Sequence, residues 1–283
     1  MVSEIFTIGD FCFRLICPAD VKLPANFLKF RGGSNPVYTY TLAVADQFPV
    51  PEGTVAAQRG DILVLRRDGL ERRYLGVKGQ PEPYACYMET SEKEARILLA
   101  SHRRSSMELD PMFSSLLALE RRQMAYGGLI LHCAFLVHRG EAILFSAPSG
   151  TGKSTQADLW ARFRGTETLN GDRALIQKTG GRWHARGWPV CGSSGICENR
   201  DVPIRAVVML SQAPEDCARR LPPMQAFTRL YSQITVNRWD RQSQLQAMGL
   251  LEDLIASVPV YHLACTMDKT AVEALEQALN TAQ

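Results

Sequence analysis

The stretch Glu141-Ala-Ile-Leu-Phe-Ser-Ala-Pro-Ser-Gly-Thr-Gly-Lys-Ser-Thr155 decides the fold of this chain. Its first part, residues 142–145, is an apolar run typical of a buried strand, and residues 156–163 after the loop are typical of a helix. Strand, small-residue loop, lysine, hydroxyl and helix in this order are the arrangement of a phosphate-binding P-loop. The usual pattern is G-x-x-x-x-G-K-[ST], and Ala147 stands at its first position.

Glycines and a helix start give this loop a physical reason to hold phosphate. Glycine lets backbone N–H groups turn toward phosphate oxygens, and the helix N-terminus adds a partial positive charge at the same place. Lys153 is predicted to reach the β- and γ-phosphates, and the Ser154 hydroxyl to coordinate Mg²⁺. A glycine-rich turn that binds nothing is the alternative. The predicted phosphate-binding residues are Ser149, Gly150, Thr151, Gly152, Lys153, Ser154 and Thr155.

The composition is that of an ordinary globular protein. A chain of 283 residues suits one large domain or two ordinary ones, and its hydrophobic fraction of 46% is typical. The net charge of +3 gives no reason to expect nucleic acid or a membrane surface as a partner. The first residues lack a basic segment followed by an apolar core, and no apolar run is long enough to span a bilayer. We therefore predict a cytoplasmic location.

The eight cysteines form no C-x-x-C pair and have no histidines at zinc-site spacing. We predict reduced and mostly buried thiols. The cysteines are Cys12, Cys17, Cys86, Cys133, Cys191, Cys197, Cys217 and Cys265.

Residues 1–105 are predicted to form a small β-rich N-terminal domain. Residues 11–16 and 37–44 alternate β-branched or aromatic residues with others, and residues 84–88 are a further strand candidate. Residues 61–66 and 73–77 flank Arg67-Asp-Gly69, which indicates a hairpin. We expect an antiparallel sheet, with substrate docking and oligomerisation both open as its role. Residues 91–104 fit a helix or a strand.

Residues 106–283 are predicted to form an α/β domain around the P-loop. Apolar spacing predicts a helix over residues 112–124. Residues 129–137 and 142–145, joined at Arg139-Gly140, are expected to be a hairpin or neighbouring strands. Further strands are predicted at residues 174–176, 204–210 and 258–265, and further helices at residues 222–231, 238–256 and 270–282.

Three polar features near the P-loop each allow two interpretations. Asn170-Gly-Asp172 can supply an acidic residue that holds Mg²⁺ or orients a nucleophile, or it is only a turn. His132 in an apolar strand is either a structural residue or a functional one. The small residues 192–195 form either a second anion-binding loop or a flexible turn.

Together these features resemble the catalytic domain of HPr kinase/phosphorylase. More closely, residues 129–212 look like the shorter HPr-kinase-like proteins of peptide-modification systems. The resemblance lies in His132 before the P-loop, in Ser149-Gly-Thr-Gly-Lys-Ser154, in Asn170-Gly-Asp172 and in Gly192-Ser-Ser-Gly-Ile196.

The resemblance implies a fold related to phosphoenolpyruvate carboxykinase, with a P-loop on a mixed sheet. It also implies phosphoryl transfer from ATP, with Mg²⁺, to a hydroxyl that is typically a serine. Lys153 and Ser154 would hold phosphates and Mg²⁺, and Asp172 would be the metal ligand or general base. His132 would border the phosphate site.

The chain departs from that family at several positions. Gly171 stands where the family has the first of two acidic residues, and Gly192 or Ser193 stands where it has an arginine. Arg173 or Arg200 can substitute for that charge. Because of these departures, whether a phosphorylase activity exists stays open. The N-terminal part has no such resemblance, so HPr itself is not the expected acceptor.

The resulting prediction is an ATP- and Mg²⁺-dependent kinase that acts on a serine of a peptide or protein, or on a small hydroxyl compound. Its predicted catalytic residues are Asp172, His132 and Lys153, and Ser154 and Asp172 are the predicted metal ligands. One alternative is a nucleotide-binding regulatory module without catalysis, and another is a carboxykinase-type enzyme. The base preference and the oligomeric state, homo-oligomer included, stay open.

Overall fold

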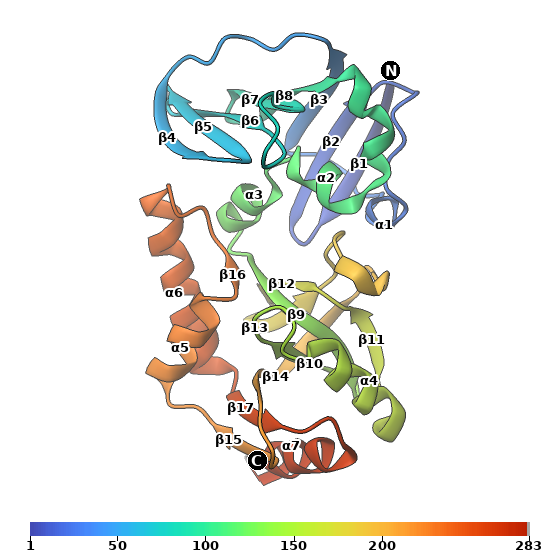
Figure 1. The fold of residues 1–283 in the computed structure, drawn as a ribbon, viewed down its shortest axis with the longest axis vertical. Coiled ribbons are helices and arrows are strands. Elements are labelled where there is room, and N and C mark those ends of the chain that lie inside the picture. The colour runs from blue at the N-terminus through green and yellow to red at the C-terminus, as the bar shows by residue number, and fades with distance from the viewer. Residues whose placement is uncertain (282–283) are drawn as a thin grey trace. The chain divides into compact units, whose positions relative to one another are not determined.

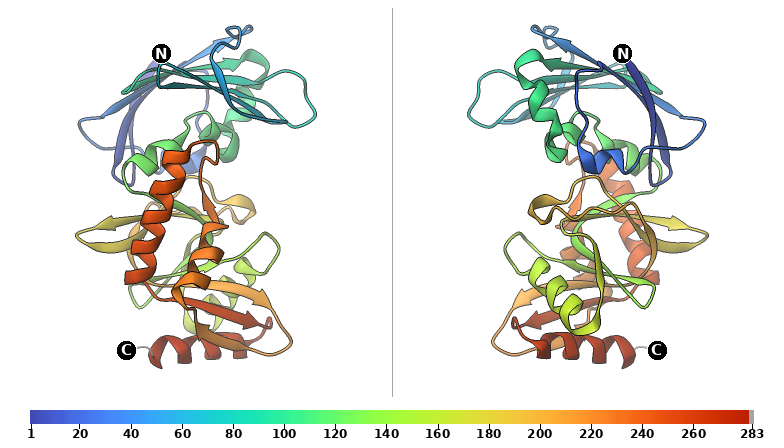
Figure 2. Two further views of the ribbon diagram at one scale, coloured as in Figure 1. Left: turned by 90° about the vertical axis from the view of Figure 1, so that its left-hand side faces the viewer. Right: turned by 90° about the vertical axis from the view of Figure 1, so that its right-hand side faces the viewer.

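A computed structural model describes residues 1–281 (Figures 1 and 2). The chain packs into two compact units, which we describe separately. Unit 1 comprises Met1–Arg122 together with the short segment Arg238–Arg241, and unit 2 comprises Gln123–Asn237 and the chain from Gln242 onward.

Unit 1 is built on one eight-stranded sheet whose strands follow the order β1-β2-β3-β8-β7-β6-β5-β4. Most neighbours are antiparallel, and the predicted hairpin is formed by β5 and β6. The prediction of a purely antiparallel sheet is wrong, because β3 runs parallel to both β2 and β8. The segment between β2 and β3 contains the helix α1 (Ala25–Leu28), and the segment between β3 and β8 contains four strands. Both segments are long enough for the second strand of each pair to run in the same direction as the first. The strands are β1 (Val2–Ile8), β2 (Phe11–Cys17), β3 (Tyr38–Ala45), β4 (Thr54–Arg59), β5 (Ile62–Arg67), β6 (Leu70–Leu75), β7 (Ala85–Ser91) and β8 (Glu94–Ala100).

The helical segment after this sheet is interrupted, contrary to the single helix predicted over residues 112–124. It consists of the 3₁₀ helix η1 (Ser101–Glu108) and the helices α2 (Asp110–Ser115) and α3 (Leu119–Ala125). Ala118 has a left-handed φ of 48°, which breaks the helix between α2 and α3. Phe113, Leu116 and Leu117 are all fully buried, so the apolar spacing that suggested one helix reflects burial of a helix and the turn after it. The undecided segment 91–104 is mainly β8 and the start of η1.

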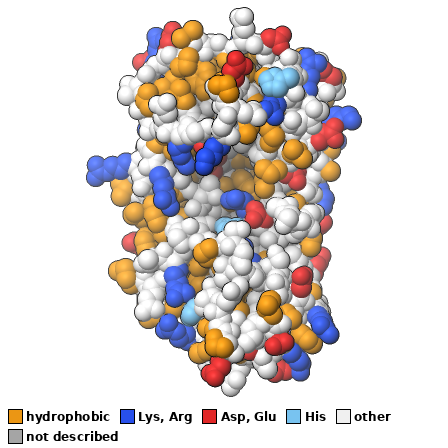
Figure 3. All heavy atoms as spheres, viewed as in Figure 1, with side chains coloured by type: hydrophobic (Ala, Val, Ile, Leu, Met, Phe, Trp, Pro, Cys, Tyr) orange, Lys and Arg blue, Asp and Glu red, His pale blue; other side chains and the backbone are white. Residues whose placement is uncertain are grey.

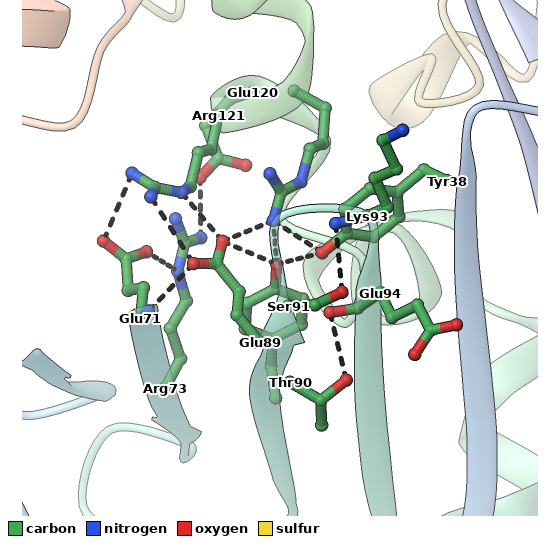
Figure 4. Close-up of polar contacts among 12 residues, drawn as sticks. Tyr38, Glu71, Arg73, Glu89, Thr90, Ser91, Lys93, Glu94, Glu120 and Arg121 are labelled. Atoms are coloured by element: carbon green, nitrogen blue, oxygen red, sulfur yellow. Dashed lines mark hydrogen bonds and ion pairs between the residues drawn. The ribbon is translucent and has the colours of Figure 1, made fainter. Parts of the chain in front are cut away.

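Unit 1 contains a largely buried cluster of charged side chains, part of which is drawn in Figure 4, and we call it the arginine–glutamate cluster. It contains four arginines and four acidic residues joined by ion pairs within 4 Å. Its members are Arg66, Arg73, Arg121, Arg122, Glu71, Glu89, Glu120 and Asp240.

Every acidic member of this cluster has a cationic partner. Arg73 Nε donates to Glu71 Oε1 over 2.7 Å, and the Glu71 side chain is 0% exposed. Arg121 Nε donates to Glu89 Oε1 over 2.9 Å, and Arg122 contacts the same carboxylate. Burial alone would raise the pKa of Glu89, but Arg122 and Arg121 hold it below its ordinary value. The cluster is therefore electrically balanced inside the unit.

The segment Arg238–Arg241 belongs to this cluster although it lies far away in sequence. Asp240 pairs with Arg66 over 2.8 Å and with Arg121 over 3.3 Å. The Trp239 ring lies below the guanidinium of Arg73, with 5.6 Å between the guanidinium carbon and the ring centroid. Trp239 and Asp240, from the C-terminal half of the chain, thus contact the charged cluster of unit 1.

Unit 2 is built on a nine-stranded sheet of mixed direction, which confirms the predicted mixed α/β class. Strands β9 and β10 form the predicted antiparallel hairpin, and β10, β14 and β17 are parallel. The long strand β14 pairs with β10 along one edge and with β13 and then β17 along the other. The strands are β9 (Leu129–His138), β10 (Glu141–Ser146), β11 (Glu167–Asn170), β12 (Arg173–Thr179), β13 (Arg182–Arg186), β14 (Asp201–Gln212), β15 (Cys217–Arg220), β16 (Ile234–Thr235) and β17 (Val260–Cys265).

Helices cover both faces of this sheet (Figures 1 and 2). On one face α4 and α7 bury Trp160 and Leu275 against Phe145 of β10, and on the other α5 and α6 bury Leu230 and Leu251. The alternation along β10 sends its neighbouring side chains to opposite faces. Burying one such side chain is worth ~1.5–3 kcal/mol. The helices are α4 (Lys153–Arg164), α5 (Pro223–Tyr231), α6 (Arg241–Ser257) and α7 (Lys269–Thr281).

The helix predictions in unit 2 are close to the structure. α6 begins at Arg241, since residues 238–240 belong to unit 1. The last residue of the predicted helix 270–282 lies outside the described residues.

The cysteines and the surface match the simple expectations from composition. All eight cysteines are free thiols, and six of them are buried. Acidic and basic side chains are intermixed on the face shown in Figure 3. Within residues 1–281, no helix combines the length and the apolar character needed to cross a membrane.

Candidate active site

The loop predicted to be a P-loop, which we continue to call by that name, connects β10 to α4 through residues 147–152. Gly150 and Gly152 have φ values of 79° and 111°, on the left-handed side where glycine is favoured. A Cβ atom at either position would have no atom within 4 Å, so backbone conformation and not space requires glycine here. Ala147 is fully buried and has no positive φ, which explains why alanine is tolerated where the usual pattern has its first glycine.

Lys153 folds back along the loop from the first position of α4. Its Nζ donates to the carbonyl oxygens of Ala147 at 3.0 Å and Pro148 at 3.3 Å, and the residue is only 8% exposed. Burial lowers the pKa of Lys153, and the negative charge of Asp172 opposes that shift. No side chain caps the start of α4, so its first N–H groups have no partner within the helix. This end of the helix can therefore accept an anion.

Asp172 lies where β12 meets β9. Its Oδ1 is 3.4 Å from His132 Nε2, and its Oδ2 accepts a hydrogen bond from Arg173 Nε over 3.1 Å. The strand register places Arg173 opposite His132. The hydrogen bond from His132 lowers the pKa of Asp172, burial works against it, and the charges of Arg173 and Lys153 add to the lowering. Asp172 is thus an ionised carboxylate at neutral pH.

The Asn170 side chain fixes the conformation of the backbone at Asp172 through hydrogen bonds. Its Oδ1 accepts hydrogen bonds from the N–H groups of Asp172 and Arg173, both over 2.9 Å. Its Nδ2 donates to the carbonyl oxygens of Trp188 and Val190. Sequence reasoning missed this positioning role, although asparagine before a glycine is a known signal for such a side-chain-stabilised turn.

The space beside Gly171 is already occupied. A Cβ atom at Gly171 would lie 2.3 Å from both Cβ and Oγ of Ser194, so a side chain here requires Ser194 to move. Ser194 belongs to the short 3₁₀ turn η2 (Gly192–Ser194). A Cβ atom at Gly192 would come within 3.0 Å of Asp172 Cβ, so this turn packs directly on the acidic turn. The turn therefore has a single carboxylate, as Gly171 in the sequence indicated, and η2 occupies the space beside it.

The two arginines considered as substitutes lie in different places. Arg173 contacts Asp172 and donates from Nη1 to Thr235 Oγ1 over 3.0 Å. Arg200 is paired with Glu167, and both side chains are largely exposed. Of these two arginines, Arg173 is the one that lies beside the Asp172 carboxylate.

The donor atoms present fit a magnesium ion that is held mostly by phosphate. Among the described residues, no group of three or more histidine, cysteine, aspartate or glutamate side chains forms a metal cage. Magnesium is usually bound by one or two protein oxygens together with substrate phosphates. The hydroxyl of Ser154, in the first turn of α4, and the carboxylate of Asp172 are oxygen donors of this kind.

The predicted site residues fall into three groups. Lys153, Asp172 and His132 interact with one another through hydrogen bonds or charge. Thr151, Gly152 and Thr155 line a cavity whose wall includes none of Lys153, Asp172 and His132. Ser149, Gly150 and Ser154 are exposed on the loop and the helix start.

Known proteins place the chain in a family. No curated protein matches it. Among solved structures, the Hpr(Ser) kinase/phosphatase from Coxiella burnetii aligns at 11% identity over 54% of this chain and 89% of that chain. The TM-score of 0.33 is too low for this alignment to bear on the function. A family model described as "SynChlorMet cassette protein ScmC" matches residues 98–280, which is more than half of the chain. The chain therefore belongs to the family of SynChlorMet cassette protein ScmC.

Proposed function

We propose that the chain is an ATP- and Mg²⁺-dependent kinase that transfers the γ-phosphoryl group to a hydroxyl. The observation that supports this most directly is the proximity of a P-loop lysine and an ionised aspartate. Ser146, which ends the strand before the loop, donates from Oγ to the His132 carbonyl over 2.8 Å, and His132 Nε2 lies 3.4 Å from Asp172 Oδ1. The charges of Lys153 and Asp172 accordingly influence each other's pKa. Phosphoryl transfer needs a cation at the phosphates and an acceptor for the hydroxyl proton, and these two side chains supply both.

The P-loop would bind the β- and γ-phosphates of ATP. The N–H groups at the start of α4 would donate to the phosphates, and Lys153 would exchange its bonds to the Ala147 and Pro148 carbonyls for phosphate oxygens. Magnesium, held by Ser154 and Asp172 as well as by phosphate, would neutralise part of the charge on the transferred group. This arrangement stabilises the charge that spreads over the phosphoryl oxygens.

Asp172 would take the proton of the acceptor hydroxyl. The acceptor oxygen forms a bond to the γ-phosphorus, the bond from that phosphorus to the β,γ-bridging oxygen breaks, and ADP leaves. His132 lies 3.4 Å from Asp172 and positions the carboxylate while bordering the phosphate site. We propose a serine of a peptide or protein, or a small hydroxyl compound, as the acceptor. We also propose that the kinase domain is residues 106–283 and that the protein acts in the cytoplasm.

A nucleotide-binding regulatory module without catalysis is the second candidate. The observation that favours it is Gly171, which leaves Asp172 as the single carboxylate of the turn, together with the absence of the family's arginine at Gly192 or Ser193. Ser194 fills the space beside Gly171. One carboxylate would then have to serve both the metal and the acceptor proton. Tight ATP binding without turnover of any acceptor would support this candidate over the kinase.

Labelled ATP distinguishes the two candidates. The full chain is incubated with Mg²⁺, γ-labelled ATP and either a serine-peptide library or a panel of small hydroxyl compounds, and both label transfer and ADP release are measured. The kinase predicts label on an acceptor. Lys153→Ala and Asp172→Asn should each abolish transfer.

Matched controls separate the site from general charge effects. Lys269→Ala and Asp158→Asn change exposed residues on helices of the same unit and should leave transfer unchanged. Full transfer by both Lys153→Ala and Asp172→Asn would contradict the mechanism.

A further inference from the structure

A groove of about 740 Å³ lies on one face of the sheet of unit 1, over the neighbouring strands β6, β7 and β8 (Figure 1). Its volume is within the ~300–1,000 Å³ typical of ligand sites. Leu70, Met88 and Leu98 give it an apolar floor, and the segment 47–49 after β3 forms a wall along one side. We call it the sheet groove.

A row of three side chains crosses the sheet groove. Alternation along β6 places Glu71 and Arg73 in the arginine–glutamate cluster and turns Arg72 to the opposite face, where it lines the groove. The strand register sets Arg72 opposite Met88 and Met88 opposite Arg96, which also lines the groove. Because neighbouring strands lie roughly 4.8 Å apart, the Cα atoms of the two arginines are about 10 Å apart, with Met88 between them.

The two arginines of this row are not neutralised by the protein. Within residues 1–281, neither Arg72 nor Arg96 forms an ion pair with a carboxylate, and this includes Glu94 two residues along β8. Arg72 is half-buried and lies near the hydroxyl of Tyr74, which is neutral because burial raises its pKa to about 12. The Glu89 carboxylate is taken by the arginines of the cluster. The sheet groove thus combines two positive charges with an apolar floor.

The wall of the sheet groove is fixed, and its other side is open. Tyr74 Oη donates to the Pro49 carbonyl over 2.9 Å, and Phe48 packs on the apolar cluster beneath it. Little ordering cost therefore remains on the protein side when a partner binds. Thr90 and Arg96 on the open side are exposed. A groove with a single wall suits an extended chain that continues past it better than a small molecule that needs to be enclosed.

We propose that the sheet groove binds an extended acidic segment of a partner polypeptide, with carboxylates on Arg72 and Arg96 and an apolar side chain over Met88. Guanidinium and carboxylate groups match in charge and in geometry. Alternate side chains of an extended chain point the same way and lie about 6.6–6.8 Å apart. An acidic, an apolar and an acidic residue at alternate positions therefore match the row. The inference concerns unit 1 alone and does not depend on the proposed kinase activity.

Fluorescence anisotropy with the full chain and without ATP tests the chemistry of the partner. The probe is a fluorescein-labelled peptide, Ser-Glu-Ser-Leu-Ser-Glu-Ser, which carries the three residues at alternate positions. Replacing both glutamates of the peptide by glutamine should weaken binding at least about tenfold, because both charged hydrogen-bonded pairs are lost. Replacing its leucine by serine should weaken binding about tenfold, because the apolar floor then stays in contact with water.

Substitutions of the two arginines place the binding in the sheet groove. Arg96→Gln changes an exposed side chain and should weaken the peptide about tenfold, and Arg72→Gln should do the same. Arg96→Glu should weaken the glutamate peptide further and strengthen binding of the peptide with lysine in place of glutamate. Arg31→Gln is the matched control, because Arg31 pairs with Glu4 and does not line the groove, and it should change nothing.

Each other result would overturn the inference. Unchanged affinity in both Arg72→Gln and Arg96→Gln, or equal binding of the glutamate and glutamine peptides, would exclude the charge match. Equal competition by inorganic tripolyphosphate or a seven-residue oligothymidylate would show a general anion surface. A dimer in sedimentation that Arg96→Gln dissociates would assign the face to a second copy of the chain. Should Arg72→Gln fail to fold, the two substitutions of the exposed Arg96 still decide the question.

Discussion

The arginine–glutamate cluster of unit 1 and the P-loop site of unit 2 use charge in opposite ways. In the cluster each acidic group has a cationic partner within the unit, and Glu71 and Glu89 are almost completely buried. In the site, Lys153 is bonded to two backbone carbonyls, although a carboxylate lies near enough to affect its pKa. Buried charges that serve the fold are matched internally.

This difference teaches how a binding site can be told from a structural ion network. A lysine whose hydrogen bonds go to carbonyl oxygens can exchange them for phosphate oxygens without leaving another charge unpaired. Removing one charged side chain from the arginine–glutamate cluster instead leaves its partner buried without an opposite charge. Substitutions should therefore affect activity in one region and stability in the other.

The largest expected effect is on catalysis, from Asp172→Asn. The amide keeps the shape of the side chain but cannot accept the acceptor proton, so phosphoryl transfer should fall by ~10²–10⁴-fold. The free energy of unfolding, measured by urea denaturation, should change by less than about 1 kcal/mol, because the carboxylate is partly exposed. A large loss of stability in this variant would place Asp172 with the structural charges.

The next effect is on stability, from Glu89→Gln in the cluster. Arg121 and Arg122 would lose their shared carboxylate in a buried setting, and the free energy of unfolding should fall by about 3–5 kcal/mol. Urea denaturation measures this. Glu92→Gln, on an exposed turn of the same unit, is the control and should have almost no effect. An unchanged stability of Glu89→Gln would show that the cluster is dispensable for folding.

A smaller effect is expected at the contact between the acidic turn and η2. Gly171→Ala places a methyl group against Ser194, which should cost about 1–3 kcal/mol of stability. Ser194→Gly removes the obstructing side chain, and the double variant should recover most of that loss. Thermal unfolding of the four proteins gives the coupling between the two positions. If the stability change of the double variant equals the sum of the two single changes, the steric explanation for Gly171 is wrong.

The smallest expected effect is on the stability of the protein at low pH. The pKa of Glu89 in the folded chain lies below its ordinary value of 4.5. Its stabilising contribution is therefore present above pH 4.5 and is lost as the pH falls through the lower folded value. Stability measured from pH 5 downward should decline less steeply in Glu89→Gln than in the wild type, by at most ~1.4 kcal/mol per pH unit. Parallel curves would show that Glu89 does not contribute to acid unfolding.

Local sequence patterns predicted the parts of the fold that depend on local contacts. The hairpin of β9 and β10, the P-loop glycines and the helix after them all follow from periodicity and turn chemistry over a few residues. The break at Ala118 could not be predicted, because burial of Leu116 and Leu117 requires knowledge of what packs against them.

Contacts between distant segments account for what the sequence could not reveal at the site and in the cluster. Ser194 blocks the space beside Gly171 only because η2 folds onto the acidic turn. Charged residues such as Arg73 and Glu71 on a strand are usually solvent-exposed, and nothing local indicates that they are buried together. The pairing of Asp240 with Arg66 joins residues far apart in the chain.

The return of Arg238–Arg241 to unit 1 has a consequence for how this protein can be divided. The backbone passes from one unit to the other after Arg122, after Asn237 and after Arg241, so a single cut does not separate them. A truncation that begins at Gln123 would retain Trp239 and Asp240 but lose Arg66 and Arg73, with which they interact. Such interlacing makes exchange of one half between relatives at a single junction unfavourable.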